Sequence, residues 1–321
     1  MVEYDLIVIG AGAAGLIAAG RAAKRGREVL LLEKNEQVGK KILMTGKGRC
    51  NLTNDCAVEE IIKNFPETGK FLYSALYTLN SWQLRSFFAD LGVETKVERG
   101  ARVFPVSDSA ADIVKALKRY INQTGVELQL NSTVEDIMTE KNRVSGVRLA
   151  SGSEFKAKNI LLAVGGKAYP STGSAGDGYQ MAKEIGHNLN SIQPSLVPLE
   201  TKEGWVKDAQ GLNLRNVRVT LKAEGEEIAA EFGEMLFTHF GVSGPIILTL
   251  SRQAVEYLST DLKLSINLKP ALSKQKLDNR LQRDFAKYSR KQFKNSLDDL
   301  LPRKLIPVII DLISIPADKF V

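Results

Sequence analysis

The chain has 321 residues, of which 44% are hydrophobic and 25% are charged, and its formal net charge is +7. This is the composition of a soluble globular protein with room for about two domains. No apolar run is long enough to cross a membrane. Glu3 and Asp5 stand where a signal peptide would carry basic residues, so we expect no leader. Two cysteines, Cys50 and Cys56, exclude a disulfide framework and suit a reducing cytoplasm.

The amino-terminal stretch has the order strand, glycine turn, helix, strand, acid. An apolar run over residues 4–9 is followed by the turn GAGAAG and by an Ala-rich helix expected over residues 16–25. A second apolar run, over residues 29–32, ends on Glu33. This order is the βαβ fingerprint of dinucleotide binding, with its full context present. It predicts a dinucleotide site and does not choose between FAD and NAD(P).

Each glycine of the turn has a physical role. Gly10 allows the tight turn, Gly12 lets the backbone approach a pyrophosphate, and Gly15 lets the helix pack closely on the strand. The positive end of the helix faces the phosphates, and Glu33 can accept hydrogen bonds from a ribose diol. The candidate cofactor contacts of this stretch are Gly10, Gly12, Ala13, Ala14, Gly15, Glu33 and Lys34.

The segment after Glu33 is rich in glycine and basic residues and reads GKKILMTGKGRCN over residues 39–51. Gly46 and Gly48 permit close approach of the backbone, and the lysines and Arg49 can screen phosphate charge. The segment begins at the carboxyl end of a strand, where ligands gather in open α/β sheets. We therefore expect a loop that contacts the cofactor.

These motifs resemble those of a family of bacterial flavoproteins. The segment GKKILMTGKGRCNLTN, behind GAGAAG and LLLEK, looks like that of FAD-dependent oxidoreductases that include aminoacetone-oxidase-like and bile-acid-reductase-like proteins. In that family the GRCN loop wraps FAD. The resemblance implies cofactor contacts by Lys41, Thr45, Gly46, Arg49, Cys50 and Asn51. Cys50 has no partner cysteine at redox spacing, so a packed loop cysteine is the preferred interpretation.

A second stretch matches the same family. An apolar strand is expected over residues 159–164, followed by GGKAYPSTGSAGDG and a helix over residues 179–185. The glycine pair lets the backbone pass close to a ligand. The candidate contacts here are Ala163, Gly165, Gly166 and Tyr169, and the resemblance adds Val134, whose backbone would meet the adenine. The chain has one dinucleotide fingerprint, so NAD(P)H is left open as a transient co-substrate.

The fold class expected is α/β. Helices are expected within residues 59–123, with Ser81 capping one of them, and a strand pair over residues 97–104. A strand over residues 126–130 and an antiparallel meander over residues 134–157 follow. Together these predict a Rossmann-like FAD-binding domain with a parallel sheet, helices and a small meander. The resemblance implies that a β-barrel and helical domain is inserted into it.

The expected elements and the resemblance together predict the domain boundaries. We expect the FAD-binding domain over residues 1–192 and the inserted domain over residues 193–321, β-rich over 193–250 and mainly helical over 251–321. Family members continue with a segment that returns to the FAD-binding domain and contains a GGYN motif, and nothing similar occurs here. The resemblance therefore covers the amino-terminal part of the expected protein, and we expect an incomplete flavin-ring site.

The function expected is that of an FAD-dependent oxidoreductase. It would transfer hydride to or from an unidentified small molecule, with NAD(P)H or dioxygen as partner. The alternatives are a catalytically inactive nucleotide-binding fragment and an NAD-dependent dehydrogenase. Residues 251–321 hold 14 Lys and Arg against 8 Asp and Glu, but a solvated helix face is preferred over a nucleic-acid site. No metal site and no catalytic side chain is assigned, and the substrate and oligomeric state stay open.

Overall fold

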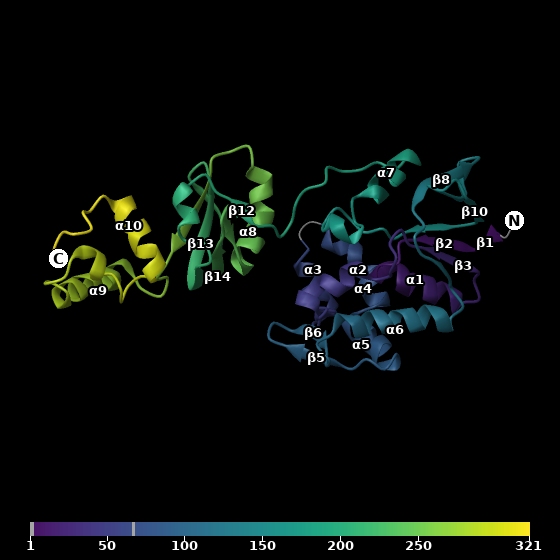
Figure 1. The fold of residues 1–321 in the computed structure, drawn as a ribbon, viewed down its shortest axis with the longest axis horizontal. Helices are drawn as coiled ribbons and strands as arrows, with labels where there is room; N and C mark the ends of the chain where they lie inside the picture. The colour runs from purple at the N-terminus through teal and green to yellow at the C-terminus, as the bar shows by residue number, and fades with distance from the viewer. Residues whose placement is uncertain (1–2, 66–67) are drawn as a thin grey trace. The chain divides into compact units, whose positions relative to one another are not determined.

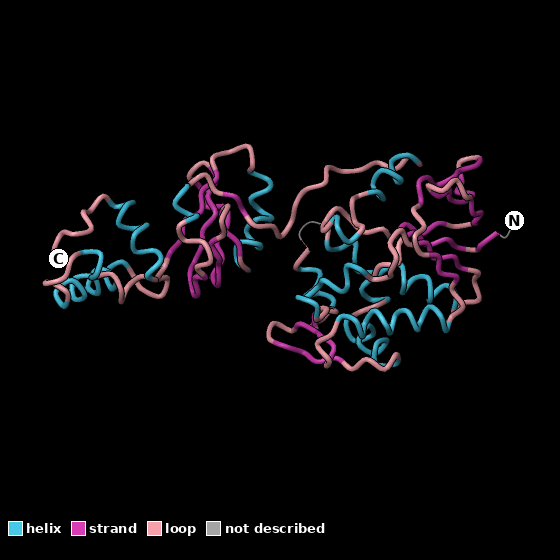
Figure 2. The backbone as a smooth tube through the Cα atoms, in the orientation of Figure 1, coloured by secondary structure: helices cyan, strands magenta, loops and turns pink. Residues whose placement is uncertain are grey.

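The computed structural model describes residues 3–65 and 68–321, and the chain divides into two compact units. The first unit ends at Asn190 and the second begins at Ser191, close to the domain boundary predicted after residue 192. Figure 1 follows the chain by residue number, and Figure 2 distinguishes its helices from its strands. Each unit is described by itself.

A four-stranded parallel sheet forms the centre of the first unit, with the strand order β11, β2, β3, β7. The strands are β2 Leu6–Ile9, β3 Val29–Leu32, β7 Glu127–Gln129 and β11 Ile160–Leu162. The strands β2 and β3 consist of Val, Ile and Leu without interruption. Continuous apolar strands of this kind are stable where both faces of a parallel sheet are covered.

The two faces of this sheet have different covers because successive side chains of a strand point in opposite directions. Val8 packs with helices α1 (Ala13–Ala23) and α6 (Ala110–Gln123) on one face. Ile7 and Ile9 pack against an antiparallel sheet on the other face. That sheet has the order β1, β10, β9, β8, and its strands are β1 Glu3–Tyr4, β8 Val134–Glu140, β9 Arg143–Leu149 and β10 Glu154–Ala157. The predicted meander is confirmed.

Shorter elements connect β3 to β7, and α7 (Asp177–Glu184) follows β11. The connecting elements are α2 Lys40–Met44, β4 Thr53–Asn54, α3 Val58–Lys63, α4 Tyr73–Thr78, α5 Ser81–Asp90, β5 Thr95–Glu98 and β6 Arg102–Pro105. The predicted strand pair is confirmed as β5 and β6, which form a three-stranded sheet with β4. The predicted cap Ser81 is wrong. Asn80 caps α5 through a reciprocal pair of 2.8 Å hydrogen bonds with Gln83, the capping-box arrangement.

The second unit contains a five-stranded antiparallel sheet with the order β12, β15, β14, β13, β16. Its strands are β12 Leu199–Glu200, β13 Asn213–Ala223, β14 Glu226–Phe237, β15 Gly241–Ser243 and β16 Leu262–Asn267. Thus β16 joins the sheet from within the part that was expected to be mainly helical. Helix α8 (Pro245–Ala254) packs on the sheet, while α9 (Lys274–Lys287) and α10 (Ile306–Ile313) contribute to a second hydrophobic cluster that contains Phe293.

Candidate functional site

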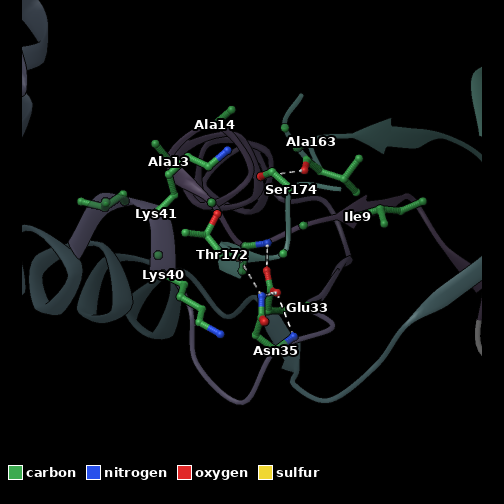
Figure 3. A pocket seen from close by; sticks show the side chains of 18 of the residues that line it. Ile9, Ala13, Ala14, Glu33, Asn35, Lys40, Lys41, Ala163, Thr172 and Ser174 are labelled. Atoms are coloured by element: carbon green, nitrogen blue, oxygen red, sulfur yellow. Dashed lines mark hydrogen bonds between the residues drawn. The ribbon is translucent and has the colours of Figure 1, made fainter. Parts of the chain in front are cut away.

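A cavity of about 630 Å³ opens at the carboxyl ends of the central strands of the first unit. Its wall includes Ile9 and Gly10 at the end of β2, Leu32 and Glu33 at the end of β3, and Ala163 after β11. Figure 3 shows the side chains around it. The volume is typical of small-molecule and cofactor sites, and ligands of open α/β sheets bind at this edge. We take this cavity as the candidate site.

The glycine turn before α1 forms one wall of the cavity. Gly10 has a φ of 101°, and a Cβ atom added there would lie 2.7 Å from the carbonyl oxygen of Ala163. A Cβ atom on Gly15 would lie 1.9 Å from the carbonyl oxygen of Gly10. Gly12 differs, because it lines the cavity, has a φ of −80° and has no heavy atom within 4 Å of an added Cβ atom. The fold therefore requires Gly10 and Gly15, whereas Gly12 leaves space open toward the cavity.

The amino terminus of α1 opens into the same space. Ala13 and Ala14 line the cavity, and no side chain caps the first turn of the helix. The first backbone N–H groups of a helix have no partner within it and carry partial positive charge. The first turn of α1 also holds no acidic residue that would repel an anion. These features make a site for a phosphate or pyrophosphate group.

Glu33 connects the glycine turn to the segment that follows β3. Its side chain is buried, with 8% of the residue exposed. The Oε2 atom accepts a 2.8 Å hydrogen bond from the backbone N–H of Ala11, and Oε1 accepts from the backbone and side-chain nitrogens of Asn35 at 2.9 and 2.6 Å. Figure 3 shows this arrangement. Because Oε2 accepts one bond here and a carboxylate oxygen can accept two, Glu33 can also receive a ribose hydroxyl.

Residues 165–177, which we call the strap segment, lie along another wall. Three contacts connect it to the segment after β3. The Lys34 Nζ lies 2.5 Å from Asp177 Oδ2, the Asn35 Nδ2 donates to the carbonyl oxygen of Thr172 at 3.3 Å, and the Lys41 Nζ donates to that of Ala168 at 2.8 Å. Five members of the strap segment line the cavity: Gly165, Thr172, Gly173, Ser174 and Asp177.

The GRCN stretch forms part of the wall. Residues 40–44 form helix α2, and the chain then makes an irregular turn in which Gly46, Lys47, Gly48 and Cys50 all have positive φ, as the predicted glycine-rich loop requires. Thr45, Cys50 and Asn51 line the cavity. Burial raises the pKa of the Cys50 thiol, although a hydrogen bond with Thr45 acts in the opposite direction. Cys50 is therefore a packed, protonated thiol at neutral pH, and it is not an activated nucleophile.

Arg49 turns away from the cavity toward the strand pair β5–β6. Its Nε donates to Asp108 Oδ1 at 2.8 Å, its Nη2 forms an ion pair with Glu98, and its guanidinium lies 4.1 Å from the ring centre of Phe104. Arg49 is not among the residues that line the cavity. In the described structure it connects the GRCN stretch to the neighbouring hairpin and so supports the wall from behind.

The structure brings most of the predicted contacts together. Those that line the cavity are Gly10, Gly12, Ala13, Ala14, Glu33, Lys34, Lys41, Thr45, Cys50, Asn51, Val134, Ala163 and Gly165. Those outside its lining are Gly15, Gly46, Arg49, Gly166 and Tyr169. Lys40, one of the lysines expected to screen phosphate charge, also lines the cavity. The polar lining residues that were not among the candidates are Asn35, Ser132, Thr133, Thr172, Ser174 and Asp177. Asn35 could have been predicted, because it stands only two residues after Glu33. Leu84, Phe88 and Met181 line the cavity from helices, and no sequence motif predicted that they would do so.

The chain is similar to known proteins. Residues 4–258 match the family model of the HI0933-like protein Rossmann domain. The chain belongs to this family. Over 95% of its length it is 32% identical to the 3-dehydro-bile acid delta(4,6)-reductase of Clostridium scindens, of which the match covers 74%. Over 97% of its length it is 30% identical to the ribosomal RNA dihydrouridine synthase of Haemophilus influenzae, of which the match covers 75%.

A solved structure, the open conformation of a flavocytochrome c3 fumarate reductase, matches 67% of this chain and 47% of its own with 23% identity and a TM-score of 0.49. The family membership confirms the predicted fold class, a Rossmann-like FAD-binding domain, and the predicted class of FAD-dependent oxidoreductases. Among the described residues, no helix is both long and apolar enough to cross a membrane.

Proposed function

We propose that this HI0933-like protein binds FAD in the cavity of its first unit and reduces a carbon–carbon double bond conjugated to a carbonyl group. The observation that carries the proposal is the buried Glu33, which lies at the carboxyl end of β3 beside an uncapped helix terminus. A ribose acceptor next to an anion site is the combination that an adenine dinucleotide requires.

Different residues of the cavity fit different parts of the cofactor. Glu33 would orient the ribose, and the open space at Gly12 with the amides of α1 would receive the pyrophosphate. Val134, near the strand end of β7, would lie at the adenine. The apolar side chains of α5 and α6 in the lining, among them Phe88, would exclude water. Bound FAD supplies hydride-transfer chemistry, while the protein binds, orients and shields it.

The names of the relatives indicate the reaction class. The Clostridium scindens protein is named as a delta(4,6)-reductase and the Haemophilus influenzae protein as a dihydrouridine synthase. Both names describe the addition of two hydrogens to a carbon–carbon double bond. Such a reduction consumes two electrons and two protons, for which we propose NAD(P)H and solvent as the sources. With one dinucleotide fingerprint in the chain, NAD(P)H would bind transiently.

The cofactor proposal is tested by titrating the purified chain with FAD and, separately, with NAD, and by following flavin absorption and the heat of binding. We expect retained flavin bands after removal of free FAD and at least tenfold weaker binding of NAD. Absence of flavin bands after reconstitution would overturn the FAD assignment. Equal or tighter binding of NAD would instead support a dehydrogenase.

A uridine in RNA is the second candidate substrate. The relatives in Haemophilus influenzae and Escherichia coli are named ribosomal RNA dihydrouridine synthases, and each is 30% identical to this chain over nearly its whole length. The observation in favour is the strong positive charge of residues 274–294. NADPH consumption with uridine-containing RNA, compared with a steroid enone, distinguishes the two substrates. A gain of two hydrogens per modified uridine, measured by mass spectrometry, would identify RNA.

A further inference from the structure

The positive charge of the chain is concentrated in one short region of the second unit. Residues 274–294 contain eight Lys and Arg and two Asp, which is a net charge of +6 out of +7 for the whole chain. The region consists of α9 and the segment that follows it. An ordinary solvated helix face has mixed charge, so this concentration calls for a polyanionic partner.

Four cations form a stripe along α9. Lys276, Arg280, Arg283 and Lys287 are separated by four, three and four residues, which places them on one face of the helix. At 1.5 Å per residue the stripe is about 16 Å long. The Arg283 side chain is 74% exposed and that of Lys287 is 60% exposed. The stripe therefore presents an extended row of charge to solvent.

The stripe is held in place and is only partly neutralised. Asp284 is buried, and Arg280 contacts it at 3.2 Å and Arg283 at 3.7 Å. Lys287 lies 2.9 Å from Asp299. Two arginines share one carboxylate, so the group keeps a net positive charge. In the described part of the chain, no ion pair is formed by Lys276 of the stripe or by the exposed Arg290 and Lys294 that follow α9.

Another face of α9 is apolar and half-buried. Leu277, Leu281 and Phe285 recur every four residues on that face, and Phe285 packs against a cluster containing Phe293 and Ile306. A helix that binds a membrane surface must insert its apolar face between lipids. Here Leu277, Leu281 and Phe285 are all half-buried and Phe285 packs within the protein, so the exposed cationic face is the better surface for a partner.

We propose that the stripe of α9 and the exposed cations of residues 290–294 form a docking surface for RNA. The inference rests on the second candidate function, in which a uridine in RNA is the substrate. Phosphate contacts position a nucleic acid without reading its sequence, and release of counterions drives the binding. The surface would hold the RNA backbone while the reaction takes place elsewhere.

The test uses the full chain and a fluorescein-labelled, uridine-containing RNA oligonucleotide, with fluorescence anisotropy measured over a series of salt concentrations. The test variant is Lys276→Gln/Arg290→Gln/Lys294→Gln, which leaves every ion pair of Asp284 intact. The control is Lys202→Gln/Lys207→Gln/Arg215→Gln, which removes the same number of exposed Lys and Arg residues elsewhere in the second unit. Both variants change the net charge of the chain equally.

We expect the test variant to bind RNA at least tenfold more weakly at low salt, and the control to stay within twofold of the unaltered chain. The slope of log affinity against log salt should fall by about 2, since each contact to a single strand contributes about 0.7. The flavin spectrum should be unchanged, which separates this outcome from failure of the FAD proposal. Equal losses in both variants or preferential binding to phosphatidylserine vesicles would overturn the proposal.

Discussion

The carboxylate of Glu33 lies between the glycine turn and the segment after β3, and it already accepts three hydrogen bonds from protein donors. Glu33 supports the fold, because its carboxylate holds the N–H of Ala11 in the turn that faces the cavity, and we propose that it also binds the ribose of FAD. A residue with both roles should show both effects when it is changed.

For the substitution Glu33→Gln we expect weaker FAD binding by about tenfold or more, and a loss of about 1–3 kcal/mol in the free energy of unfolding. The amide can accept through one atom only, so a buried N–H group loses its partner. FAD fluorescence quenching and urea unfolding measure the two effects. Glu36→Gln, at an exposed position in the same segment, is the control. Equal behaviour of the two variants would contradict the role of Glu33.

The reactivity of the Cys50 thiol should depend on pH. Burial raises the pKa of its thiol, so the reactive thiolate should be scarce at pH 7 and should increase only above the usual thiol range near pH 8.5. We expect slow alkylation at neutral pH, faster alkylation in alkali, and protection by FAD. Peptide mass spectrometry separates Cys50 from Cys56, which lies outside the cavity lining and should be insensitive to FAD. Faster reaction of Cys50 than Cys56 at pH 7 would refute this.

Among the elements, the strap segment is directly connected to the candidate site, because it lines the cavity and also bonds to residues 34, 35 and 41. Lys34 and Asp177 are separated by 143 residues in the sequence, so their ion pair depends on the folded first unit. Its side chains are 27% and 41% exposed, and such pairs contribute at most about 1 kcal/mol to stability.

The substitution Asp177→Asn should therefore leave the free energy of unfolding nearly unchanged and accelerate FAD release several-fold, because the strap segment loses its contact with Lys34. Stopped-flow displacement of FAD measures the release rate. Asp136→Asn removes the ion pair with Arg148 on the antiparallel sheet and is the matched control. Release that is unaltered or slower than in the control would show that the strap segment does not retain the cofactor.

For the whole molecule, most of the parallel sheet was predictable because β2, β3 and β11 are continuous apolar runs, and glycines follow β2 and β11. The cavity wall at Gly12, Glu33 and Ala163 was also predictable, because these residues belong to sequence motifs that begin where a strand ends. The contacts of Lys34 and Asn35 with the strap segment were not, because they join segments far apart in sequence. Arg49 has its partners on a hairpin about fifty residues away, which a glycine-rich loop motif does not encode.

The units have separate hydrophobic cores, so we expect that the FAD binding proposed for the first and the RNA binding proposed for the second can be changed independently in the full chain. The charge of residues 274–294 was visible in the sequence, but the ion pairs of the stripe and the packing of Phe285 against the cluster with Phe293 were visible only in the structure. The RNA variants and the cavity variants therefore report on different parts of the molecule.

The central claim is that the cavity beside Gly12 receives the pyrophosphate of FAD. Gly12→Val tests it most directly, because Gly12 has an ordinary φ of −80° and free space around an added Cβ atom, so the fold is not strained. Gly204→Val is the control, at another glycine with nothing within 4 Å of an added Cβ atom. In an FAD titration we predict unchanged folding for both variants and loss of FAD binding, by a hundredfold or more, for Gly12→Val alone. Tight FAD binding by the folded Gly12→Val variant would contradict the account.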